Sequence, residues 1–134
     1  MPTPKLSSWL AVLVCVGCAT SKQHTTAPSA RIAFENDKVR VIEYHTGSGK
    51  DICGLGMHSH PPHVYIMTTD AKLRIITPDG KESVENAKAG DVGWEDAVEH
   101  RAENVMGNNA ECYVIEIKDK NWKPSTGLGA SSGR

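Results

Sequence analysis

From residue 30 onward, the apolar residues of this chain recur with a period near two, not the period of about 3.6 that marks an amphipathic helix. The clearest runs cover 39–44, 64–67, 73–77 and 112–117, and they are rich in β-branched residues. Glycines interrupt these runs, and no stretch longer than about two turns has a helical pattern. Many short strands in one domain predict an all-β fold, either a sandwich or a small barrel.

A hairpin is predicted around Pro78-Asp79-Gly80, which separates the runs 73–77 and 81–85. Proline presets φ for the first turn position, and glycine tolerates the positive φ that tight turns need. We therefore expect the two runs to pair as neighbouring antiparallel strands.

The strand pattern covers residues 30–119, which suffice for one hydrophobic core and leave no room for a second domain. Residues 18–29 are polar and lack periodicity, as a tether does. Residues 120–134 mix Gly, Ser and Pro, which predicts a flexible tail with Trp122 as the last side chain to dock.

The N-terminus has the pattern of a secretory signal. Lys5 precedes an unbroken apolar run over 9–16, which is shorter than the ~20 apolar residues needed to span a bilayer. The run closes in Cys15-Val16-Gly17-Cys18, which resembles the lipobox of bacterial lipoproteins. That resemblance implies a signal peptide over 1–17, cleaved before Cys18, with Cys18 as the lipid-modified first residue of the mature chain.

Ordinary signal cleavage after Ala19 is the alternative, because Gly17-Cys18-Ala19 has the small-x-small form. Either way the mature domain is expected to be exported, to the periplasm or, as a lipoprotein, to the outer membrane. Contact with the membrane is expected only through the N-terminal lipid anchor. The net charge of −1 and the lack of any basic run argue against nucleic acid as a partner.

Three histidines lie within six residues, His58-Ser59-His60-Pro61-Pro62-His63, and His100 follows far along the chain. Neutral imidazole is the commonest protein ligand for first-row transition metals. On a β-strand, His58 and His60 would point to the same face, because successive side chains alternate. The cluster therefore predicts a transition-metal site.

Two motifs resemble those of the cupin family. Gly56-Met57-His58-Ser59-His60-Pro61 is similar to its first motif, where a histidine-x-histidine pair opens the metal site. Ala89-Gly90-Asp91-Val92, followed by His100 and Asn104, is similar to its second motif. The likeness spans about residues 32–118 and implies a small jelly-roll β-barrel with His58, His60 and His100 around a divalent metal.

One ligand of the family pattern is missing. The glutamate expected four or five residues after His60 is replaced by Val64 and Tyr65. If His63 turns inward, the site becomes a cage of four imidazoles; if it turns outward, three imidazoles and open positions remain. Such a site suits Fe, Zn, Ni, Cu or Mn rather than Mg or Ca.

The sequence does not assign a definite role to the other residues near the motifs. Tyr65, Trp94 and Asn104 are candidates for lining a pocket, and the sequence assigns no catalytic residue. Cys53 and Cys112 permit one internal disulfide. The alternative that a cysteine is a metal ligand also remains open.

Three functional classes follow from these patterns. By resemblance, the chain could be a metal-dependent enzyme of the dioxygenase, isomerase or lyase type. It could instead bind a small molecule or metal without turnover, or carry a structural metal in the cell envelope. A homodimer paired through edge strands is also expected by resemblance alone.

Overall fold

The computed structural model describes residues 29–125. In this range the chain is all-β, as predicted, and it contains no helix long and apolar enough to cross a membrane. The expected signal peptide, the lipidation site Cys18 and the tether lie outside the described residues, except for the last residue of the tether. The strands are β1 (Ser29–Glu35), β2 (Val39–Thr46), β3 (His58–His60), β4 (His63–Met67), β5 (Ala71–Ile76), β6 (Glu82–Ala87), β7 (Val92–Glu95), β8 (Val98–Asn104) and β9 (Ala110–Ile117).

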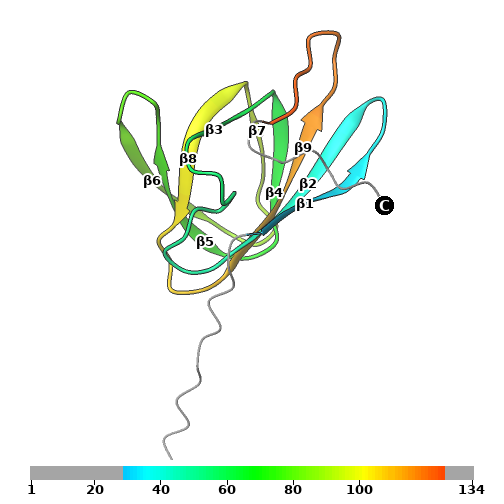
Figure 1. Cartoon of the computed structure of the whole chain (residues 1–134). Helices are drawn as coiled ribbons and strands as arrows, with labels where there is room; N and C mark the ends of the chain where they lie inside the picture. Colours follow the sequence, from blue (N-terminus) through cyan, green and yellow to red (C-terminus); the bar gives the residue numbers. More distant parts are fainter. Residues whose placement is uncertain (1–28, 126–134) are drawn as a thin grey trace, which may run out of the picture.

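The strands form two antiparallel sheets. One has five strands in the order β1-β2-β9-β4-β7, and the other has four in the order β3-β8-β5-β6. Figure 1 shows them as two walls, with β5, β6 and β8 on one side and β1, β2 and β9 on the other. The small jelly-roll barrel expected from the sequence is confirmed.

The predicted hairpin joins β5 to β6. Its strands pair antiparallel, with Leu73 opposite Glu85 and Ile75 opposite Ser83. In the turn, the Gly80 N–H donates to the Thr77 carbonyl at 2.9 Å, and Gly80 has a φ of 78°. Glycine is favoured at that position because a side chain strains a backbone with positive φ.

Inward-facing side chains divide the interior into an apolar part and a polar end. Strand β9 illustrates the division, since its alternate residues Ala110, Cys112, Val114 and Glu116 are all buried. The apolar part contains Ile42, Tyr44, Ile52, Cys53, Met67, Ala71, Ala102, Ala110, Cys112 and Val114. The polar end contains His58, His60, His63, His100 and Glu116.

Residues after β9 return to this polar end. Lys118 and Arg40 place their cationic groups 4.4 Å and 5.0 Å from the centre of the Trp122 ring. Such cation–π contacts hold an aromatic side chain against charged neighbours. Three residues later, Ser125 is buried. The first part of the expected tail therefore packs on the domain, and residues 126–134 lie outside the described range.

Candidate metal centre

Strands β3 and β8 bring three of the four predicted histidines together. His58 lies directly opposite His100 in the antiparallel pair, and His60 lies two residues further along β3. Because side chains alternate along a strand, His58 and His60 both point inward, as their spacing predicted. The His100 ring centre lies 5.1 Å from that of His58 and 5.4 Å from that of His60.

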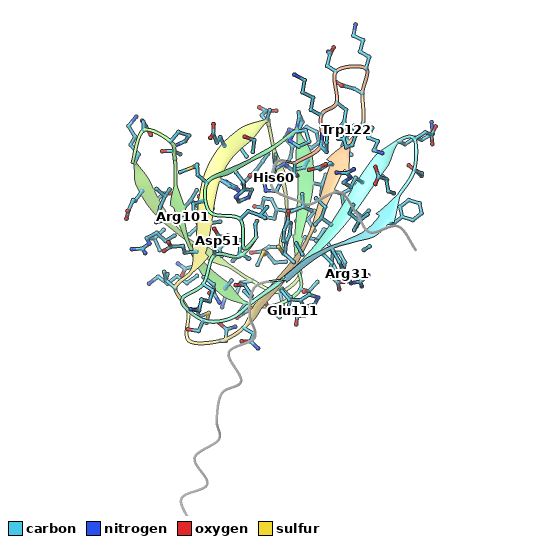
Figure 2. The ribbon with its side chains drawn as sticks, in the orientation of Figure 1. Arg31, Asp51, His60, Arg101, Glu111 and Trp122 are labelled. Atoms are coloured by element: carbon cyan, nitrogen blue, oxygen red, sulfur yellow. The ribbon has the colours of Figure 1, made fainter. Side chains whose placement is uncertain are left out.

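His63 joins them from the other sheet. It begins β4 after Pro61-Pro62, and it is turned inward with only 2 % of its surface exposed. Its ring centre lies 5.0 Å from that of His60. The structure thus gathers all four histidines at one buried end of the barrel. Figure 2 shows His60 between the sheets on the side of Trp122, with Arg31 and Glu111 at the opposite end.

Hydrogen bonds fix the orientation of these rings. His58 Nδ1 lies 2.8 Å from the Gly56 carbonyl, and His63 Nδ1 lies 2.8 Å from the Pro61 carbonyl. A carbonyl only accepts, so each Nδ1 carries the proton. His60 Nδ1 is 2.9 Å from Ser125 Oγ. Each Nε2 is therefore directed away from these partners.

The Nε2 atoms of His58 and His60 lie only 2.8 Å apart. The bond to Gly56 leaves the His58 Nε2 with a lone pair, and that lone pair faces the second imidazole. Cys53, which the sequence left open as a ligand, adds its Sγ at 3.9 Å from His60 Nε2. The donor atoms of these three residues lie within 4.8 Å of one another, and all three residues are buried.

Two carboxylates flank His63. Strand pairing places Glu95 of β7 on one side of it and Glu116 of β9 on the other. Glu95 Oε2 lies 3.4 Å from His63 Nε2. Glu116, which is fully buried, places Oε1 3.8 Å from His60 Nδ1 and accepts a hydrogen bond from the Ser125 N–H at 3.1 Å.

Reasoning from sequence missed Glu116 and Ser125. A signal for Glu116 was present, because it occupies the inward phase of a strand whose other inward residues are apolar. A charged residue in that phase is almost never fully buried unless it has a partner. Ser125 gave no such signal, since it follows the last strand in a segment rich in polar residues.

The protonation behaviour of the histidines follows their surroundings. Burial, reinforced by the neighbouring His60 and His58, lowers the pKa of His100 to about 4. Burial also lowers the pKa of His60, although the nearby Glu116 opposes the shift. His100 and His60 are therefore neutral near pH 7, which is the form that binds metals.

His63 behaves in the opposite way. Burial is the largest single influence and lowers its pKa, but the hydrogen bonds to Glu95 and to the Pro61 carbonyl, with the charges of Glu95 and Glu116, together outweigh burial and raise it. The same hydrogen bond lowers the pKa of Glu95. The pair can therefore hold a proton beside the other histidines.

A cavity of about 110 Å³ adjoins the histidine cluster. Its polar wall includes His60, His63, His100 and Glu95, and its apolar wall includes Ile52, Cys53, Met67, Leu73, Ile75, Ala87, Ala102, Cys112 and Val114. Such a mixture of apolar walls and a few convergent polar groups is typical of small-molecule sites.

The pocket candidates from the sequence differ in their positions. Tyr65 lines the cavity. Trp94 does not; its side chain is 55 % exposed and its indole N–H donates to Asp96 at 3.1 Å. Asn104 is buried away from the cavity and holds a turn, donating to the Asn108 carbonyl at 2.7 Å.

The two cysteines of the domain are free thiols. Both line the cavity, and burial raises the pKa of each, to about 12 for Cys112 and well above its ordinary value for Cys53. His45 lies outside the cluster, between Glu43 and Glu111.

Comparison with known proteins identifies the fold. A cupin domain from Bordetella pertussis Tohama I superposes with a TM-score of 0.63 at 24% identity, covering 71% of this chain and 97% of its own. An RmlC-like cupin from Methanocaldococcus jannaschii, described as a double-stranded β-helix, gives 0.56 at 13% identity over 72% and 84% of the two chains. The protein therefore has the cupin fold.

A third similar structure is that of an enzyme. Oxalate decarboxylase from Bacillus subtilis, a protein with Mn(II) centres, has a TM-score of 0.56 at 20% identity. The match covers 79% of this chain but only 29% of the decarboxylase chain. No protein-family model matches the sequence, and no curated protein matches it either. These similarities identify the architecture, and fold alone does not decide activity.

Proposed function

We propose that this cupin-fold protein binds a divalent transition metal through its buried histidines and takes a small molecule into the adjoining cavity. The observation that carries the proposal is the approach of His58 Nε2 to His60 Nε2 at 2.8 Å while the Gly56 carbonyl fixes the proton of His58 on Nδ1. A cation that takes both Nε2 lone pairs would replace the hydrogen bond between the two rings with shared coordination.

The donor chemistry fits this role. Imidazole nitrogens suit first-row transition metals, and the low pKa of His100 and His60 keeps their lone pairs available near neutral pH. Hydrogen bonds from ligand Nδ1 groups to a carbonyl or hydroxyl, as at His58 and His60, are typical supports of metal-binding histidines. Fe, Zn, Ni, Cu and Mn are the ions that the test below distinguishes.

A metal-dependent enzyme is the second candidate function, and the His63–Glu95 pair is the observation that favours it. When bound, a metal supplies Lewis acidity to an oxygen or nitrogen of the small molecule. The His63–Glu95 pair lines the same cavity and can accept or return a proton there. Leu73 and Ile75 give that cavity an apolar wall. This arrangement supports isomerase or lyase chemistry.

The first experiment is elemental analysis of the purified full chain beside a His58→Ala/His60→Ala double variant. We expect about one equivalent of a transition metal in the parent and almost none in the double variant. His45→Ala is the matched control, because His45 lies in the rim between Glu43 and Glu111 and should leave the metal content unchanged. A parent that takes up no metal even after reconstitution would contradict the proposal.

We also propose that the protein is an exported lipoprotein with Cys18 as its acylated residue, on the strength of the lipobox-like Cys15-Val16-Gly17-Cys18. Growth with radiolabelled palmitate should label the parent, and Cys18→Ala should abolish the label. A Cys18→Ala protein that carries as much label as the parent would refute this proposal.

A further inference from the structure

Cys53 is held rigidly in the connection between β2 and β3. The Asp51 carboxylate accepts hydrogen bonds from the N–H groups of Cys53 and Gly54, both at 2.9 Å, and of Gly56 at 2.8 Å. The neighbouring Ile52 N–H donates to the Ala102 carbonyl of β8 at 2.6 Å. The Cys53 backbone is therefore anchored to the strand that carries His100, and Figure 2 shows Asp51 beside this strand.

This anchoring places the sulfur among the imidazoles. Cys53 Sγ lies 3.9 Å from His60 Nε2. The donor atoms of Cys53, His58 and His60 all lie within 4.8 Å of one another. Zinc–nitrogen and zinc–sulfur bonds of ~2.1 Å and ~2.3 Å allow two ligands of one ion to lie up to about 4.4 Å apart. The distance between the Nε2 atoms of His58 and His60 is 2.8 Å, and that between Cys53 Sγ and His60 Nε2 is 3.9 Å. Both distances are shorter than this limit.

Glu116 supplies an independent indication of positive charge. It is completely buried, and its Oε2 has no hydrogen-bond partner within residues 29–125. Burying an uncompensated carboxylate is costly, so a cation near His60 would stabilise it. A dication with the Glu116 carboxylate and one thiolate forms a group with no net charge, which suits an interior position.

We propose that the Cys53 thiolate is a ligand of the metal alongside His58 Nε2 and His60 Nε2, which makes the site a mixed sulfur–nitrogen centre. The inference rests on the proposed metal-binding function and specifies its ligand class. Thiolate ligands select thiophilic ions such as Zn²⁺ or Cu⁺ over Mn²⁺. Cys112 lines the same cavity, but it does not belong to the cluster of donor atoms.

Cobalt(II) provides the test, because a cysteine ligand gives it a thiolate-to-metal charge-transfer band in the near ultraviolet that imidazole ligands do not give. The protein is the full chain carrying Cys15→Ser and Cys18→Ser, so that Cys53 and Cys112 are the only thiols. In this background we expect one equivalent of Co²⁺ to produce the band. Cys53→Ser should abolish the band and weaken cobalt binding at least tenfold, whereas Cys112→Ser should retain both.

The outcomes separate the two proposals. Cobalt binding without the band, or a Cys53→Ser spectrum equal to that of its parent, overturns the thiolate ligand and leaves histidine binding intact. Absence of cobalt binding in the parent removes both proposals. X-ray absorption of the zinc-loaded parent needs no variant at this position; one sulfur at ~2.3 Å beside nitrogens at ~2.0–2.1 Å supports the assignment, and a shell without sulfur overturns it.

Discussion

Ser125 Oγ lies 2.9 Å from His60 Nδ1, although 65 residues separate the two in sequence. Ser125 also donates its N–H to Glu116 Oε1 at 3.1 Å, so one residue connects the end of the chain to a histidine and a buried carboxylate. Such partners orient a ligating imidazole and select its tautomer. The segment after β9 is therefore part of the candidate metal centre.

Ser125→Ala should weaken metal binding by about tenfold, because loss of a partner of a ligating histidine commonly costs 10–100-fold in affinity. The measurement is competition for Zn²⁺ with a chromophoric chelator. Ser83→Ala is the matched control, since Ser83 is exposed on β6. Equal affinities for the parent and Ser125→Ala would show that His60 does not depend on this contact.

Glu95→Gln should lower the pKa of His63. Burial opposes protonation of His63, and the carboxylate at 3.4 Å is the principal group that overcomes it. Without the Glu95 charge, burial should determine the pKa of His63 and lower it. Imidazole NMR signals followed against pH in metal-free protein measure the change, with Asp96→Asn as the control because Asp96 bonds the Trp94 indole instead. An unchanged His63 titration in Glu95→Gln would rule out the carboxylate as the cause.

The features that could be predicted from the sequence are those that depend only on residues close together along the chain. The β5–β6 hairpin follows from Pro78 and Gly80, and the common inward direction of His58 and His60 follows from strand alternation. These features need only local chemistry, so a pattern of a few residues specifies them. The order of strands in each sheet was accessible only through the resemblance to cupins.

The groups that complete the site depend on pairing between distant strands. Glu116 reaches His63 because β9 lies beside β4, and Glu95 reaches it because β7 lies on the other side. A shift of one residue in either register would turn these carboxylates to the opposite face of the sheet. No local pattern fixes such registers, which is why the spacing of the histidines alone could not identify their charged neighbours.

Metal-free protein should lose stability as the pH falls from about 7 to about 5. His100 has a pKa of about 4 when folded and an ordinary value of 6.5, so the unfolded chain binds the proton first over this range. One such group lowers the free energy of unfolding by about 2 kcal/mol between these two pH values. Urea unfolding in a chelator should show this loss in the parent and a smaller one in His100→Asn. Equal losses in both proteins would show that His100 is not the group responsible.

Gly93→Ala should close part of the cavity and destabilise the fold. Gly93 pairs directly with Tyr65 across β4 and β7, and a Cβ at Gly93 would collide with the Tyr65 ring. Because Tyr65 lines the cavity, its ring must move, and overpacking of this kind costs about 1–3 kcal/mol. Gly107→Ala is the control, since a Cβ there meets nothing within 4 Å. Chemical denaturation measures the difference in the free energy of unfolding. A Gly93→Ala variant as stable as Gly107→Ala would show that the Tyr65 ring can move away from residue 93 without an energetic cost.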